Sequence, residues 1–237
     1  MIDRPEPSGH RWTSYGRGHR SDRGREFERS SRTVHARDSS RFERTLALSN
    51  GVFAISLTLL VLSVAVPTDT PGAELGGALV ELVPTLVAFA LTVFIVGLYW
   101  RNHNDLFDSL AGVDGTLFGL NVGYLALVAL VPFPNDLIGS YPGEPVAYAV
   151  FATVIAGLAV MDTAMFVHAR RRGLLREGVT DRTYRVDLLR GTLTVLVFVA
   201  SVPLAFVLGP WTPVIWVSLL AADAAIDAAT PGRRDGE

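Results

Sequence analysis

The stretch Arg44–Val66, RTLALSNGVFAISLTLLVLSVAV, decides how the rest of the chain is read. It is apolar and long enough to cross a hydrocarbon core of about 30 Å as a helix that rises about 1.5 Å per residue. Its first turns nevertheless carry Arg44, Ser49 and Asn50, which a simple lipid anchor does not need. The stretch therefore predicts a membrane helix whose polar first turns have a role beyond anchoring the chain in lipid.

Apolar runs of this length recur along the chain. After the first run, at about 45–66, five more follow at about 76–100, 113–133, 145–168, 188–209 and 211–230. Soluble cores do not contain such repeated runs, and a backbone in lipid must satisfy its own hydrogen bonds. The sequence predicts an all-α membrane protein with six transmembrane helices.

The segments outside these runs are short or polar. Residues 1–42 are rich in Arg, Ser and Gly and contain few large aliphatic residues, so we expect a disordered Arg-rich cytoplasmic arm. Its arginines are interpreted as solvated, and binding to anionic lipid headgroups is the alternative. Residues 43–231 are expected to form the six-helix transmembrane domain, and 232–237 a cytoplasmic tail.

The arginines predict the topology. All 21 basic residues are Arg, and they lie before the first span and after the second, fourth and sixth spans. The connections PTDTPGAELGG, PNDLIGSYPGEP and GPWT contain none. By the positive-inside rule, both termini are expected to be cytoplasmic in a multi-pass protein of the cell membrane, with residues 67–75 and 134–144 outside. The absence of Lys indicates a GC-rich or salt-adapted prokaryotic genome.

Signatures of enzymes and of resident cofactors are missing from the sequence. There is no Walker A loop, no GxGxxG, no HExxH, no GxSxG and no Cys, so no catalytic site, cofactor or metal site is expected. Ionisable groups within the spans are few. Asp162 and His168 are interpreted as snorkelling or locally paired groups, and Asp223 and Asp227 as facing a cytoplasmic-side interface.

The first helix carries two kinds of face. At 100° per residue, one stripe contains Ile55, Thr58, Leu59, Leu62 and Val66. A row of serines repeats every seven residues on a neighbouring face, at Ser49, Ser56 and Ser63. From periodicity alone, the aliphatic stripe is expected to meet lipid, and the serine row to meet a neighbouring helix.

The end of the second span, GLYWRNHNDLF, lies at the same membrane depth as the start of the first. Arg44 is therefore expected to reach Trp100 through a cation–π contact, or Asn50 and nearby carbonyl groups through hydrogen bonds. His103 is expected in the same network. The alternative is that Arg44 and Trp100 act only as interfacial anchors.

These motifs carry a family resemblance. RTLALSNGVFAISLTLLVL resembles the first-helix signature of the transmembrane protein 175 family, the lysosomal potassium channels and their prokaryotic six-span relatives. That signature is Arg, three residues and then Phe-Ser-Asp, and here Leu48 replaces the Phe and Asn50 the Asp. WRNHNDLF is similar to the family's Trp-x-x-His-x-x-Leu-Phe, and LNVGYLALVALVPFP to its third helix.

The resemblance implies a homotetramer whose first helices line a central pore, without a TVGYG-type filter. It places Ile55, Leu59 and Leu62 as hydrophobic layers facing the pore and Thr58 beside them. Arg44, Ser49, Asn50, Trp100 and His103 would form a structural network at the cytoplasmic end.

The function that this resemblance implies is a potassium-permeable, leak-type cation channel. The partners expected are further copies of the chain, the lipid bilayer and permeant potassium ions, with no nucleic acid. Two alternatives stay open: a proton-coupled secondary transporter that uses His103, Asp162 or His168, and a non-conducting membrane scaffold. The sequence contains no convincing internal repeat of the kind that transporters show.

Overall fold

The computed structural model of the chain describes residues 34–37, 39–65, 68 and 71–217. Most of the expected N-terminal arm, the last part of the expected sixth span with Asp223 and Asp227, and the expected tail lie outside the described residues. Within the described part, the helices are α2 (Ser40–Leu60), α3 (Leu75–Glu81), α4 (Val83–Asp108), α5 (Gly115–Leu130), α6 (Pro132–Ser140), α7 (Pro145–Arg171) and α8 (Asp181–Leu208). Short 3₁₀ turns follow α2 and α8, at η1 (Val61–Ser63) and η2 (Gly209–Trp211).

Five segments of the described chain are long and apolar enough to cross a membrane. They are Ser40–Ser63, Val83–Asp108, Gly115–Ser140, Pro145–Arg171 and Asp181–Trp211. They correspond to the first five expected spans, so the all-helical membrane class is confirmed. Of the expected sixth span, residues 213–217 are helical, and the remainder lies outside the described residues.

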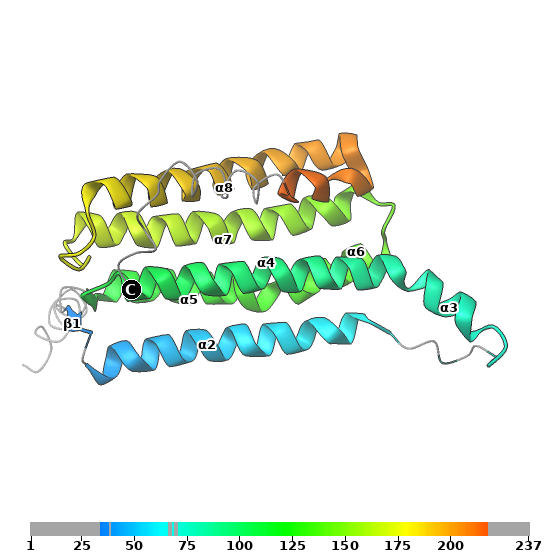
Figure 1. The fold of residues 1–237 in the computed structure, drawn as a ribbon, viewed down its shortest axis with the longest axis horizontal. Helices are drawn as coiled ribbons and strands as arrows, with labels where there is room; N and C mark the ends of the chain where they lie inside the picture. The colour runs from blue at the N-terminus through cyan, green and yellow to red at the C-terminus, as the bar shows by residue number, and fades with distance from the viewer. Residues whose placement is uncertain (1–33, 38, 66–67, 69–70, 218–237) are drawn as a thin grey trace, which may run out of the picture.

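Prolines account for two wrong boundaries. The second long helix begins at Val83 and not near 76, because Pro84 suits a helix start and the chain turns at Leu82. The preceding residues form α3, which projects from one end of the bundle (Figure 1). The outer loop expected at 134–144 is also shorter than predicted, because α6 continues the third span to Ser140.

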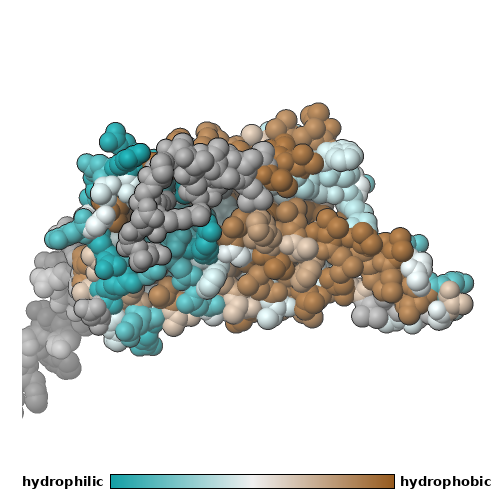
Figure 2. Space-filling view, viewed as in Figure 1, coloured by the Kyte–Doolittle hydropathy of each residue, from teal (hydrophilic) through white to brown (hydrophobic). Residues whose placement is uncertain are grey.

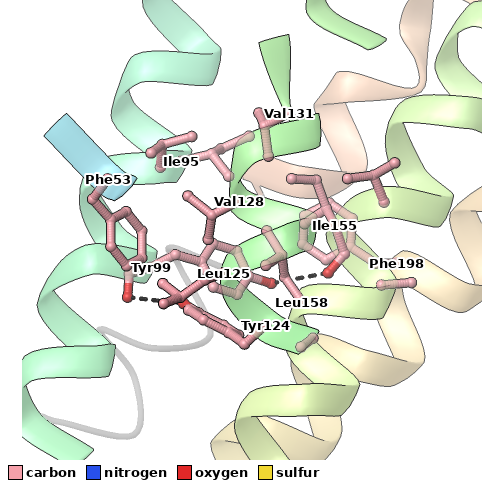
Figure 3. Close-up of a cluster of buried hydrophobic side chains, with 14 of the residues drawn as sticks. Phe53, Ile95, Tyr99, Tyr124, Leu125, Val128, Val131, Ile155, Leu158 and Phe198 are labelled. Carbon is pink, nitrogen blue, oxygen red and sulfur yellow. Dashed lines mark hydrogen bonds between the residues drawn. The ribbon is translucent and has the colours of Figure 1, made fainter. Parts of the chain in front are cut away.

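The long helices run in alternating directions and form one bundle. Figure 1 shows α2 and α8 at opposite edges, with α4, α5 and α7 between them. α2 packs against α4, α5 and α6, while α8 packs mainly against α7. In the core, Phe53, Val128 and Ile155 meet from α2, α5 and α7 (Figure 3). The hydroxyl of Tyr99 donates to the carbonyl of Ile155 at 3.4 Å, so this apolar centre also satisfies a polar group.

One end of the bundle is polar, and three chain segments are joined there. The strand β1 (His35–Ala36) pairs antiparallel with β2 (Gly112–Val113), which lies between α4 and α5. The α7–α8 loop joins them through the amide of Ala111, which donates to Leu174 at 2.7 Å. Figure 2 shows hydrophilic side chains gathered at this end and apolar ones over the middle of the visible face.

This junction, which we call the polar-end junction, fixes where α2 begins. The side chain of Arg37 donates to the carboxylate of Asp108 at 2.7 Å and to its carbonyl at 2.8 Å. A β-carbon on Gly112 would lie 2.6 Å from the carbonyl oxygen of His35, so only glycine allows the two strands to approach this closely. Ser39 then caps α2 by accepting the amide of Phe42.

Candidate functional site

The face of α2 that packs inside the chain is set by a polar ladder. Three serines seven residues apart bond to groups of α5 and α6 that lie 72 residues further along the chain in each case. Ser49 accepts from the amide of Asn121 at 3.1 Å, Ser56 donates to the carbonyl of Val128 at 2.8 Å, and Ser63 accepts from the amide of Asn135 at 2.8 Å. The constant offset means that α2 runs parallel to α5 and α6 in one register. The predicted contact of the serine row with a neighbouring helix is confirmed.

The middle rung of this serine ladder exists because of a proline. Pro132 has no amide hydrogen, so the carbonyl of Val128, four residues earlier, lacks its regular helical donor. The amide of Val131 donates to it at 3.2 Å, and the hydroxyl of Ser56 supplies a second and shorter bond. A carbonyl freed in this way must find a partner when it lies in lipid or in a buried core. The proline of one helix therefore helps to fix the rotation of another.

Because the serine ladder holds one face of α2 inward, the opposite face is uncovered. Phe42, Thr45, Ser49, Phe53, Ser56 and Leu60 are buried. The predicted stripe residues Ile55, Thr58, Leu59 and Leu62 are all exposed, with 60% of Ile55 and 73% of Leu62 uncovered. The hydroxyl of Thr58 donates to the carbonyl of Ile55 at 2.8 Å and is thereby satisfied within its own helix.

The outer end of the stripe departs from the predicted helix. The α-helix ends at Leu60 and not near Val66, and Leu62 belongs to the 3₁₀ turn η1. The hydroxyl of Ser63 donates to the carbonyl of Leu60 at 2.7 Å, which helps to close this tighter turn. Leu62 remains on the exposed side, whereas Val66 lies outside the described residues.

His103 sits in a fully buried network. Its Nε2 atom lies 2.8 Å from Oδ1 of Asn121, whose amide group donates to Ser49. Its ring is stacked between those of Phe107 and Tyr124, with centroids 4.5 and 5.2 Å away. His103 therefore connects α4 to the start of the α2–α5 ladder. Our reading of the sequence did not include Asn121, although an isolated Asn in an apolar span was a signal for it.

Asn50 and Trp100 form a separate, exposed pair between α2 and α4. The indole of Trp100 donates to Oδ1 of Asn50 at 2.9 Å. The contact predicted between Arg44 and Trp100 is wrong within this chain. Among the described residues, Arg44 has no hydrogen bond or cation–π contact with either partner, because six residues separate it from Asn50 and it faces the stripe side of the helix.

A third cluster of polar side chains surrounds Asp114, which caps α5 at the polar end. The carboxylate accepts the amide of Leu117 at 2.8 Å and lies 2.9 Å from Nε2 of His168 and 3.6 Å from Arg172. Burial acts to raise the pKa of Asp114, but the bonds from Leu117 and His168 and the charges of His168 and Arg172 outweigh it and lower this pKa. The local pairing predicted for His168 is confirmed.

The residues of the transporter alternative do not form one cluster. His103 bonds to Asn121, and His168 lies against Asp114. Oδ1 of Asp162 has no hydrogen-bond partner among the described residues. Among the residues that the structure describes, no group of three or more His, Asp or Glu side chains could hold a metal ion.

The comparisons with known proteins agree on one family. The profile described as "Endosomal/lysosomal potassium channel TMEM175" matches residues 44–132, which include most of α2, the His103 network and all of α5. A protein named as a potassium channel of Streptomyces collinus is 37% identical over 175 residues, covering 71% of this chain and 84% of its own length. Another from Chamaesiphon minutus is 35% identical over 161 residues, covering 65% and 78%.

A solved structure shares the fold. It is the crystal structure of a "lysosomal potassium-selective channel TMEM175 homolog" from Chamaesiphon minutus, and it superimposes with a TM-score of 0.70 at 26% sequence identity. The superposition covers 80% of this chain and 100% of that one.

Proposed function

This chain belongs to the TMEM175 family of potassium channels, and from that membership we propose that it conducts potassium ions through a pore lined by α2. The observation that carries the proposal is the serine ladder, which fixes the rotation of α2 so that Ile55, Leu59 and Leu62 are exposed. No described helix covers this stripe, and we infer that further copies of the chain do.

A pore lined by α2 requires several copies. Within one chain, the described helices close around a solid aromatic and aliphatic core, and the stripe points outward. Cyclic symmetry brings the same stripe from each copy to a common axis. We propose a homotetramer, the assembly implied by the family resemblance of the first helix, whose signature is matched at Arg44 and Ser49.

The stripe has the chemistry of a dry constriction. Rings of Ile55, Leu59 and Leu62 offer no oxygen to replace the water around an ion, so an ion entering the rings is partly dehydrated. K⁺ loses water at lower cost than Na⁺, and a narrow apolar ring therefore favours K⁺ without a cage of carbonyl groups. Beside them, the hydroxyl of Thr58 donates its proton to the carbonyl of Ile55, which leaves the lone pairs of its oxygen available to water or to a cation.

We propose that the polar-end junction and both termini are cytoplasmic. Arg37, Arg172 and Arg176 lie at this end, together with Arg170 and Arg171 at the end of α7, as the positive-inside rule requires. With Cys absent from the chain, single introduced cysteines report the side directly. A cysteine at Gly143 should react with an impermeant reagent outside intact cells and one at Gly178 should not, whereas the reverse pattern would contradict this orientation.

Ion flux in liposomes that contain the purified protein tests the channel function. A channel should pass K⁺ down its gradient without saturating over the usual range and without a matching proton flux. Saturating flux coupled to protons would favour the carrier that uses His103, Asp162 or His168. Well-folded protein that passes no ion would favour the scaffold.

A further inference from the structure

A cavity of about 790 Å³ opens at the polar end between the starts of α2 and α5. One part of its wall is basic and consists of His35, Arg41 and Arg44. Another part is apolar and consists of Leu48, Val113 and Phe118. This volume falls within the roughly 300–1,000 Å³ that small-molecule sites occupy, and the mixed wall suits a ligand with one charged end.

Among the described residues, no carboxylate pairs with Arg41 or Arg44 in this cavity. Nη1 of Arg41 donates to Nε2 of His35 at 3.0 Å, so this imidazole accepts in its uncharged form and the positive charge comes from the two arginines. Arg44 is exposed and, among the described residues, has no acidic or hydrogen-bonding partner. The acid in the cavity wall is Asp114, whose carboxylate is already engaged by His168 and Arg172 on its other side.

The donors in the cavity match an oxyanion. Each guanidinium offers several N–H groups in a plane, a geometry that fits two oxygens of one phosphate, and charge-assisted bonds of this kind are the stronger ones. Gly115 and Thr116, the first residues of α5, line the same cavity and lie at the positive end of a 16-residue helix. The capping carboxylate of Asp114 takes the next amide, that of Leu117.

We propose that this cavity binds a phosphate group, carried either by an anionic lipid at the membrane surface or by a free phosphate compound. Arg41 and Arg44 hold the phosphate oxygens, and the walls formed by Leu48 and Phe118 accommodate an organic part. Because His35 belongs to β1 and the arginines to α2, the bound phosphate also joins β1 to the start of α2. The site does not depend on conduction through the proposed pore.

The test measures binding to the full chain in phosphatidylcholine nanodiscs. In one arm, inorganic phosphate is titrated against chloride at constant ionic strength. In the other, phosphatidic acid replaces part of the phosphatidylcholine. A ligand that binds the folded state raises the unfolding temperature, so a saturable rise is expected in at least one arm. A rise with phosphatidic acid alone identifies a lipid headgroup, and a rise with phosphate identifies a free compound.

Variants decide whether the binding occurs in this cavity. Arg44→Gln and Arg41→Gln should each weaken the apparent affinity about tenfold or more, since each removes a charge-assisted bond. Arg101→Gln is the matched control. It removes one exposed charge of α4 towards the polar end of the bundle, and Arg101 is not part of the cavity wall. Hydrogen exchange at the amides of Ala36 and Arg37 should slow when the ligand is bound to the wild-type protein.

Two results would overturn the proposal. One is the absence of a saturable rise in both arms for the wild-type protein, which requires no variant to fold. The other is equal weakening by Arg101→Gln and Arg44→Gln, which would show general attraction of anions to a basic surface. If Arg44→Gln is not stable enough to measure, Arg44→Lys keeps the charge but loses the planar pair of donors, and it should bind more weakly than the wild type.

Discussion

The two edge helices of the bundle, α2 and α8, both expose aliphatic side chains, yet they are held in different ways. Ile55 and Leu62 are uncovered on the α2 side, and Val207 is 80% uncovered on α8. α2 is fixed along its length by the serine ladder and at its start by β1. Exposure of aliphatic groups therefore does not distinguish a pore face from a lipid face.

α8 shows how an edge helix can be held without such a ladder. α8 packs along α7. At the first turn of α8, Asp181 pairs with Arg170 of α7. The guanidinium of Arg170 also lies over the ring of Tyr184. Near its other end, the indole of Trp216 donates to Ser201 at 3.2 Å. α2 differs from α8 because several hydrogen bonds in one register set its rotation. A rotation fixed in this way is a stronger sign than exposure alone that the outward face has a defined partner.

The largest expected effect comes from breaking the serine ladder at its buried end. Asn121→Leu would leave Nε2 of His103 and the hydroxyl of Ser49 buried without their present partner, and should cost about 2 kcal/mol of unfolding free energy. Thr192→Val on α8 is the control, because Thr192 is exposed and bonds only within its helix. It should change stability by no more than about 0.5 kcal/mol. Similar losses in chemical unfolding of both variants would remove the distinction between the two helices.

A smaller effect is expected from the polar-end junction. Gly112→Ala places a methyl group against the carbonyl of His35, so β1 should detach, at a cost of about 1–2 kcal/mol. Hydrogen exchange at the amide of Arg37, which donates to Ala111 at 3.0 Å, should then become much faster. Gly119→Ala is the matched control, since nothing lies within 4 Å of its added β-carbon. Unchanged exchange in Gly112→Ala would show that β1 does not hold the start of α2.

The smallest effect concerns acid. The pKa of Asp114 is lower in the folded state than in the unfolded chain, so its contribution to stability is present above about pH 3.9 and is lost as the pH falls through the folded-state pKa. Asp114→Asn should lower the unfolding temperature at neutral pH and flatten its decline in acid. Asp181→Asn on α8, where the carboxylate is exposed, should keep the wild-type decline. Parallel acid profiles for Asp114→Asn and the wild type would contradict the assigned pairing.

Much of this architecture follows from local sequence. Long apolar runs predicted the five described spans, and the seven-residue serine repeat predicted a helix contact. The breaks at Leu82 and Val131 depend on how prolines sit between helices, and the sequence analysis gave these prolines too little weight. The sequence could not pair strands of two residues, such as β1 and β2, because their partners lie far apart in the chain and two residues carry no periodicity.

The candidate site was less accessible to sequence reasoning. The periodicity predicted the stripe of Ile55, Thr58, Leu59 and Leu62 as one face, but from periodicity alone that face was expected to meet lipid. The role of Asn121 depends on a parallel alignment of two helices 72 residues apart, which no local pattern contains. Arg44 was assigned to Trp100 from membrane depth alone, whereas the direction in which a side chain leaves its helix decided its actual surroundings.

The central claim is that the stripe of α2 lines the ion path, and the direct measurement is K⁺ and Na⁺ flux through Ile55→Asn in liposomes. Four amides in place of hydrocarbon should lower the dehydration barrier for both ions and more for Na⁺, so conductance should rise and K⁺/Na⁺ selectivity should fall. Val207→Asn, which makes the same kind of change on the exposed face of α8, should leave both unchanged. If well-folded Ile55→Asn keeps the conductance and selectivity of the wild type, Ile55 does not face the pore and the account of α2 is wrong.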